Sequence, residues 1–160
     1  MSRVQLIDAA TTTADRRALL APIQSAFGST PAMFRAVANS PAALKSMWAA
    51  FGALGSGVIP AKLGEQIAVA VADRNACEYC LAAHTALGRK AGASADEMSA
   101  AQMGESSDPR TAAALRFALK LVDQRGQFAD GDVQALRTAG FDDEAIVEIL
   151  AHVALNLFTN

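Results

Sequence analysis

Two cysteines and a histidine follow one another at helical spacing in the middle of the chain. Cys77 and Cys80 are the only cysteines among the 160 residues, and His84 follows Cys80 by four positions. At about 100° per residue, the three side chains fall within roughly 60° of one helix face. An imidazole on that face can accept a thiol proton or hold the resulting thiolate. The pattern predicts thiol chemistry, and a position in the first turn of a helix further favours the thiolate.

Glu65 is the candidate for a second proton-carrying group, although it precedes Cys77 by twelve positions. In one continuous helix the two residues would lie about 18 Å apart. Glu65 can therefore join the site only if the chain reverses direction between them. We predict that reversal at Asp73-Arg74-Asn75, with Asn75 as the N-cap of the next helix and Glu78 completing a capping box.

The composition predicts that helices position these residues. Alanine supplies 37 of the 160 residues, whereas valine and isoleucine together supply 15. Alanine is the best helix former, and β-branched residues favour strands. No segment shows the alternating pattern of a strand. We predict an all-α fold with about seven to nine helices, built as a single domain over 1–160 with its core motif at 60–92.

Proline, glycine and capping residues predict where these helices begin and end. The capping-box pattern of Ser94 with Glu97 starts one helix, Asp108 before a proline starts another, and Asp142 caps the last. The remaining helices are expected over the approximate ranges 14–27, 31–38, 41–55, 60–73, 75–92 and 130–140.

The last predicted helix carries a polar stripe. Glu148, His152 and Asn156 follow one another at intervals of four residues, so they share one face of the helix. Apolar residues such as Ile149 and Val153 form another face. We expect the polar stripe to be a solvated or interface surface, and the alternative is a catalytic role for His152.

Charge and hydropathy argue against nucleic acid and membranes as partners. The net charge is −2 with no block of like charges, whereas nucleic-acid binding needs a concentrated basic surface. No apolar run reaches the roughly 18 residues of a membrane-spanning helix. The first ten residues lack the apolar region of a secretory signal, so we expect a cytoplasmic protein. In such a reducing compartment, a Cys-x-x-Cys motif is typical of redox or metal chemistry.

The constellation resembles the AhpD-like alkylhydroperoxidase and carboxymuconolactone decarboxylase family. That family carries a glutamate and a Cys-x-x-Cys-x-x-x-His motif on adjacent helices, here Glu65, Cys77, Cys80 and His84. The resemblance covers residues 31–160 and is strongest over the core motif. It implies a thiol peroxidase in which Cys80 attacks the peroxide, Cys77 resolves the sulfenic acid, and His84 with Glu65 relays protons.

The resemblance also implies partners. It implies a hydroperoxide substrate, an external dithiol or redox protein as reductant, no cofactor, and a homo-oligomer (dimer, trimer or hexamer). The best-known peroxidase members have a second histidine where this chain has Tyr79, and tyrosine is a poor base at neutral pH. The decarboxylase branch generally lacks the two-cysteine motif, so lactone decarboxylation is the weaker expectation.

Several alternatives stay open on the residues alone. Cys77 is nearer the helix start and Cys80 is nearer His84 in sequence, so the order of attack is not fixed by spacing. The pair can serve a disulfide reductase or redox relay without efficient peroxide turnover. The two cysteines, His84 and Glu65 are also a possible zinc ligand set, or the cysteines are small buried hydrophobes. Glu65 alone is typical of a surface residue paired with Lys62.

Overall fold

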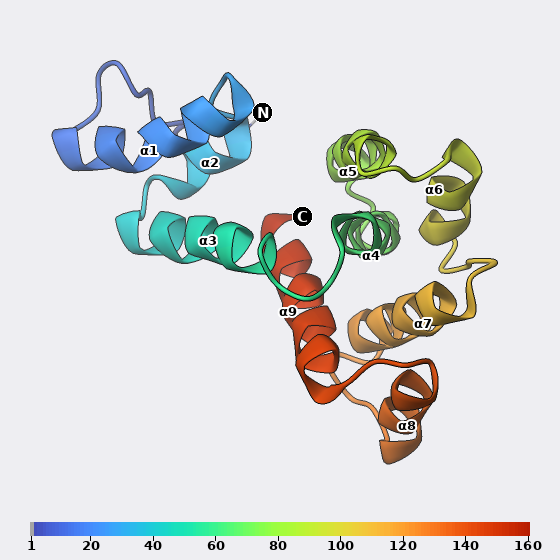
Figure 1. Ribbon diagram of the computed structural model, residues 1–160. Coiled ribbons are helices and arrows are strands. Elements are labelled where there is room, and N and C mark those ends of the chain that lie inside the picture. The colour runs from blue at the N-terminus through green and yellow to red at the C-terminus, as the bar shows by residue number, and fades with distance from the viewer. Residues whose placement is uncertain (1) are drawn as a thin grey trace. The chain divides into compact units, whose positions relative to one another are not determined.

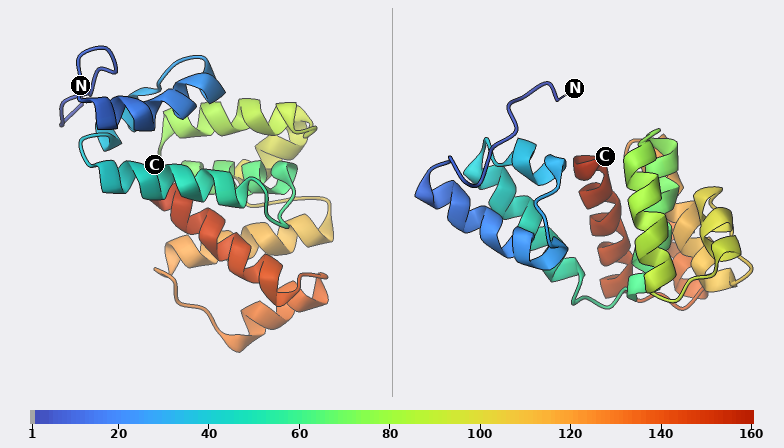
Figure 2. Two further views of the ribbon diagram at one scale, coloured as in Figure 1. Left: turned by 60° about the vertical axis from the view of Figure 1, so that its left-hand side comes forward. Right: turned by 90° about the horizontal axis from the view of Figure 1, so that it is seen from above.

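Helices account for all of the regular structure in the part of the chain that the computed structural model describes, residues 2–160. This confirms the all-α prediction, and Figures 1 and 2 show the arrangement. The nine helices of these residues are α1 (Ala14–Phe27), α2 (Ala32–Val37), α3 (Pro41–Leu54), α4 (Ala61–Arg74), α5 (Glu78–Lys90), α6 (Ala95–Gln102), α7 (Pro109–Asp123), α8 (Asp130–Thr138) and α9 (Asp143–Thr159).

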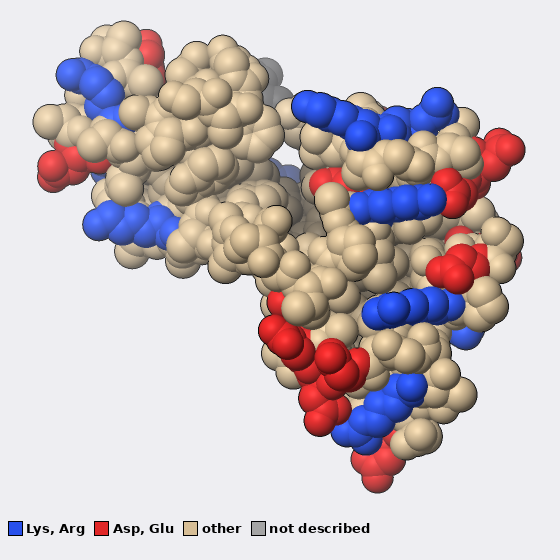
Figure 3. Space-filling model, in the orientation of Figure 1, with Lys and Arg blue, Asp and Glu red and all other residues tan. Residues whose placement is uncertain are grey.

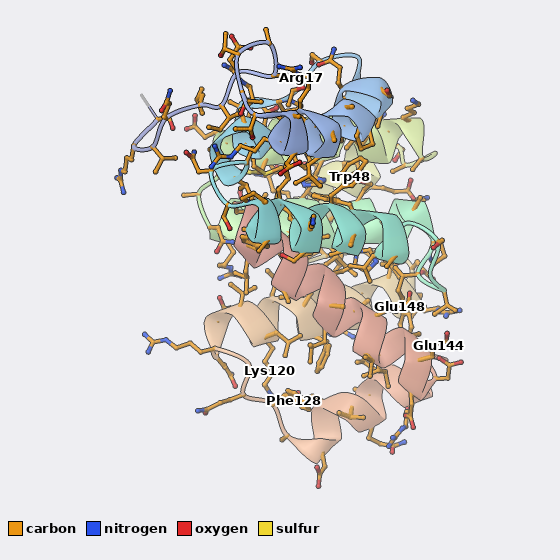
Figure 4. The ribbon with its side chains drawn as sticks, turned by 90° about the vertical axis from the view of Figure 1, so that its left-hand side faces the viewer. Arg17, Trp48, Lys120, Phe128, Glu144 and Glu148 are labelled. Atoms are coloured by element: carbon orange, nitrogen blue, oxygen red, sulfur yellow. A yellow bond between two sulfur atoms is a disulfide. The ribbon has the colours of Figure 1, made fainter. Side chains whose placement is uncertain are left out.

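The contacts divide the described chain into two compact units, one ending at Ala53 and the other spanning Leu54–Asn160. The single-domain organisation stays a prediction, and each unit is described by itself. The first unit is organised by aromatic packing among α1, α2 and α3. Phe34 lies with its ring centroid 5.8 Å from that of Trp48 and 5.9 Å from that of Phe51. Figure 4 labels Trp48 on α3.

Helix α4 is the centre of the second unit. It packs against α5, α6, α7 and α9, and Figure 1 shows α4 and α5 one above the other, seen along their axes. Between Leu63 and Ala72 every residue is buried except Glu65. A helix that is apolar almost all round is typical of a core position. Its one partly exposed residue in this stretch is the candidate carboxylate.

The predicted caps in the second half of the chain are confirmed. The hydroxyl of Ser94 accepts the N–H of Glu97 at 3.1 Å, and the Glu97 carboxylate accepts the N–H of Ser94 at 2.7 Å. Asp108 and Asp142 each accept the N–H of the residue three positions on, both at 2.9 Å. These bonds satisfy helix N–H groups that have no partner within the helix.

The predicted cap of α5 is wrong. Asn75 ends α4 as its C-cap, and Ala76 follows with a left-handed φ of +53°. Cys77 is the N-cap of α5 and makes no side-chain capping bond, so the capping box with Glu78 does not form. The physical reason is that a left-handed residue ends α4 first, letting the N–H of Cys77 donate to the carbonyl of Ala72 at 2.9 Å.

The core of the second unit supplies a stability prediction. Leu115 on α7 is fully buried, whereas Leu150 on α9 is 43% exposed. Leu115→Ala should lower the free energy of unfolding by about 2–5 kcal/mol, because it removes apolar contacts and leaves a cavity. The matched control Leu150→Ala should cost about 0.5 kcal/mol. Urea denaturation of both variants measures the difference, and equal losses would contradict this placement of the core.

The surface of the second unit carries charges of both signs. In the view of Figure 3, lysine and arginine side chains alternate with aspartate and glutamate side chains over its helices. Two of these charges join α7 to α8, where Lys120 contacts Asp132 at 2.6 Å. None of the described helices has the length and hydrophobicity needed to cross a membrane. The expectation that nucleic acid is not a partner stays a prediction.

Candidate active site

The structure places the four predicted site residues on two adjacent helices. Glu65 lies on α4, Cys80 and His84 lie on α5, and Cys77 caps the start of α5. The chain reversal required to bring Glu65 to the cysteines therefore occurs, at Asn75 and Ala76. Cys77 lies just outside the helix that was expected to contain it.

Glu65 and His84 form a direct hydrogen bond across the two helices. Glu65 Oε2 lies 2.7 Å from His84 Nδ1, and the side chains are 24% and 19% exposed. An ionised carboxylate can only accept, so Nδ1 donates and Nε2 is left as the basic nitrogen of the ring. Lys62 does not pair with Glu65, because its ammonium contacts Glu97 at 2.6 Å. The interpretation of Glu65 as the surface partner of Lys62 is therefore wrong.

Gly88 allows the two helices to come close enough for this bond. It lies one turn after His84 on α5 and is buried. A Cβ on Gly88 would lie 3.3 Å from the Cβ of Glu65 and would also collide with the end of the Met98 side chain. The absence of a side chain at this position therefore lets α5 approach α4 beside Glu65.

The two cysteines are joined by a disulfide whose Cα atoms lie 5.3 Å apart. Cys80 is buried at 8% exposure, whereas Cys77 is partly exposed. Cys80 lies in the first turn of α5, one turn before His84 on the same face. The unpaired N–H groups of a first turn stabilise a thiolate there once the pair is reduced. Tyr79, between the cysteines, is 71% exposed, so its hydroxyl is not a buried acid or base.

The sequence did not predict that the imidazole of His152, on α9, has a buried nitrogen. Its Nε2 is buried and has no hydrogen-bond partner among the described residues. Burial lowers the pKa of His152 below its ordinary value of 6.5, against the opposing charges of Glu148 and Glu65. Asn156 is also buried, at 6% exposure, and donates to the carbonyl of His152 at 2.8 Å. The solvated surface is therefore the wrong half of the expectation for both residues, and the interface surface stays a prediction.

This pKa shift predicts how stability depends on pH. Because the folded chain favours neutral His152, the unfolded chain binds more protons as the pH falls below 6.5. The contribution of His152 to stability is thus present above pH 6.5 and is lost as the pH falls toward its lowered folded pKa. His152→Gln should flatten the fall in unfolding free energy over that window. Denaturation at several pH values measures it, and an unchanged slope would contradict the assignment.

The described residues hold no group of three or more His, Cys, Asp or Glu side chains placed to bind a metal ion. The cysteine sulfurs, which would be two of the proposed zinc ligands, are bonded to each other. Zinc coordination by Cys77, Cys80, His84 and Glu65 is thus not the arrangement present. The geometry combines a disulfide-bonded Cys-x-x-Cys pair with a carboxylate–imidazole pair.

The comparisons with known proteins identify the family and the fold of the chain. The sequence model of the carboxymuconolactone decarboxylase family matches residues 41–124, a range that contains all four site residues. No curated protein matches the chain.

Three solved structures show the same fold. An alkylhydroperoxidase AhpD core, a peroxidase-related protein from Ralstonia eutropha JMP134, is 28% identical with a TM-score of 0.85, covering 98% of this chain and 85% of that one. A peroxidase-related protein from Silicibacter sp. TM1040 is 23% identical with a TM-score of 0.79, covering 99% and 90%. The debrominase Bmp8 is 18% identical with a TM-score of 0.80, covering 99% and 86%. At their lower identities, the last two show the fold alone.

Proposed function

Since the chain belongs to the carboxymuconolactone decarboxylase family and has an AhpD-like fold, we propose that it is a thiol-dependent peroxidase that reduces hydroperoxides. One observation carries the proposal: the cysteine pair lies at the start of the helix whose His84 is bonded to Glu65. A nucleophilic sulfur, a resolving sulfur and a positioned base are the groups that this chemistry needs.

The proposed cycle begins with the reduced cysteines. His84 Nε2 accepts the proton of the Cys80 thiol, and Glu65 stabilises the imidazolium through Nδ1. The Cys80 thiolate attacks one peroxide oxygen, the O–O bond breaks, and the departing alkoxide takes the proton from His84 to leave as an alcohol. Cys80 is now a sulfenic acid, which Cys77 attacks to form the disulfide and release water. The peroxide has gained the two electrons that the dithiol has lost.

The burial of the two sulfurs supports this order of attack. Cys80 is the buried cysteine and shares a helix face with His84, so it is the one whose proton the base can take. Cys77 is partly exposed, so an external dithiol can attack its sulfur and release Cys80 as the leaving thiolate. Hydroperoxide as substrate, a dithiol or redox protein as reductant, a homo-oligomer and a cytoplasmic location all belong to this proposal.

A thiol titration tests the proposed function. Reduced protein is mixed with one equivalent of an alkyl hydroperoxide, and free thiols and residual peroxide are followed over time. The proposal expects the loss of two thiols and one peroxide per chain. If thiols persist with peroxide but are rapidly oxidised by a protein disulfide, the chain is a redox relay and the peroxidase proposal fails.

A further inference from the structure

His152 lies against the backbone of α4 immediately beside Glu65. A Cβ on Gly64 would lie 3.2 Å from Cε1 and 3.6 Å from Nδ1 of His152, and Gly64 itself is buried. Because Gly64 has no side chain, the imidazole of His152 can pack directly against the backbone of α4. Glu65, the next residue, is bonded to the imidazole of His84 on α5, and its charge also acts on the imidazole of His152 on α9.

The charged groups that act on His152 are two carboxylates. Glu148, which Figure 4 labels on α9, precedes His152 by one helical turn, and Glu65 lies on α4. Helices α7 and α8 also pack against α9. Neither of them presents a described charged group that acts on the His152 ring. Each carboxylate already has a partner, because Glu148 accepts the N–H of Ile59 at 3.0 Å and Glu65 binds His84.

Because Nε2 of His152 has no hydrogen-bond partner within residues 2–160, the free energy of burying the ring depends strongly on whether the ring is protonated. A neutral ring leaves this buried nitrogen without a hydrogen bond at modest cost. A protonated ring has an N–H donor on both nitrogens, and burying an unpaired charged donor is far less favourable. A carboxylate that came within hydrogen-bond distance of the protonated ring would therefore stabilise it.

We propose that His152 is a positioning residue for Glu65: while uncharged it leaves the Glu65 carboxylate to His84, and once protonated it competes with His84 for that carboxylate. The inference rests on the proposed function in taking His84 as the base that serves Cys80. When Glu65 turns toward His152, His84 loses the acceptor that orients its ring and stabilises its imidazolium. Acidification thus removes the thiolate of Cys80 in two ways, by protonating the thiol and by disabling its base.

Alkylation of Cys80 by iodoacetamide tests this without any peroxide. The experiment uses the reduced full chain carrying Cys77→Ser, so that Cys80 is the single thiol, between pH 5 and 8. A single titrating thiol loses about tenfold in rate per pH unit below its pKa. We expect the reference chain to fall by more than tenfold per unit in the lower part of the range. His152→Gln, which cannot be protonated, should restore a fall of at most tenfold per unit.

Glu148→Gln is the second variant, and it leaves the ring of His152 in place. Removing this carboxylate takes away a charge that favours protonation of His152, so the steep segment should move to lower pH. The inference is overturned if His152→Gln keeps the steep segment, or if it lowers the rate by one factor at every pH, as a purely structural residue would. The alkylation readout involves no peroxide, so failure of the peroxidase proposal gives a different result. In that case the alkylation rates still show the steep segment and its loss in His152→Gln, but the reduced protein consumes no peroxide.

Discussion

Cys80→Ser is expected to reduce the rate of peroxide consumption at least about 10³-fold, because it removes the nucleophile of the proposed cycle. The remaining thiol, Cys77, is partly exposed and is the N-cap of α5, whereas Cys80 lies inside the helix one turn before His84. It should therefore keep its free thiol after one equivalent of peroxide. Thiol titration together with a peroxide assay measures both quantities.

Cys77→Ser is the matched control for that variant. It should lose its single thiol at nearly the wild-type rate in the first turnover, because Cys80 and its base are intact. The sulfenic acid then has no resolving partner, and a dimedone adduct on Cys80 should be found by mass spectrometry. If the adduct instead forms on Cys77 in the Cys80→Ser chain, the roles of the two cysteines are reversed.

Glu65→Gln and His84→Gln are each expected to lower the rate of Cys80 oxidation about 10²-fold. General acid–base catalysis contributes on this order, and the two side chains act as one unit through their 2.7 Å bond. The double variant should be little worse than either single one, because removing one member already disables the other. Stopped-flow oxidation of the reduced chains provides the rates.

Glu97→Gln is the control for loss of a carboxylate near α4. Glu97 pairs with Lys62 of that helix, and its side chain is 39% exposed. It touches neither member of the Glu65–His84 pair, so its rate should change less than about twofold. If Glu97→Gln lowered the oxidation rate as much as Glu65→Gln, disturbed packing of α4 would explain the loss. If the effects of Glu65→Gln and His84→Gln were additive in the double variant, the two side chains would act separately.

Much of the fold could be predicted because its helix boundaries have local chemical causes. The capping bonds of Ser94, Asp108 and Asp142 join a side chain to an N–H three residues away, so sequence spacing contains the whole interaction. The sequence predicted that Glu65 joins the site of His84 only if the chain reverses direction between the two helices. The helical periodicity then determined which side chains share the face that meets the other helix.

The rest depended on contacts that local spacing does not contain. Ala76 adopts a left-handed conformation that glycine usually marks, so the chain offered no signal that α4 ends by this route instead of by an Asn75 cap. The burial of Asn156 and of the Nε2 atom of His152 depends on where α9 lies in the folded chain. Four-residue spacing shows that two side chains share a face, but it cannot show what covers that face.

The reversal between α4 and α5 determines where the chain can accept a change of length. Only Asn75, Ala76 and Cys77 separate the two helices, and the N–H of Cys77 is already bonded to Ala72. One inserted residue that extended α5 would turn its later residues by about 100°, carrying His84 away from Glu65. The connection over 124–129, between α7 and α8, includes neither member of that pair. An epitope or a fluorescent label therefore belongs in the connection between α7 and α8. A single-residue insertion between α4 and α5 should instead separate Glu65 from His84.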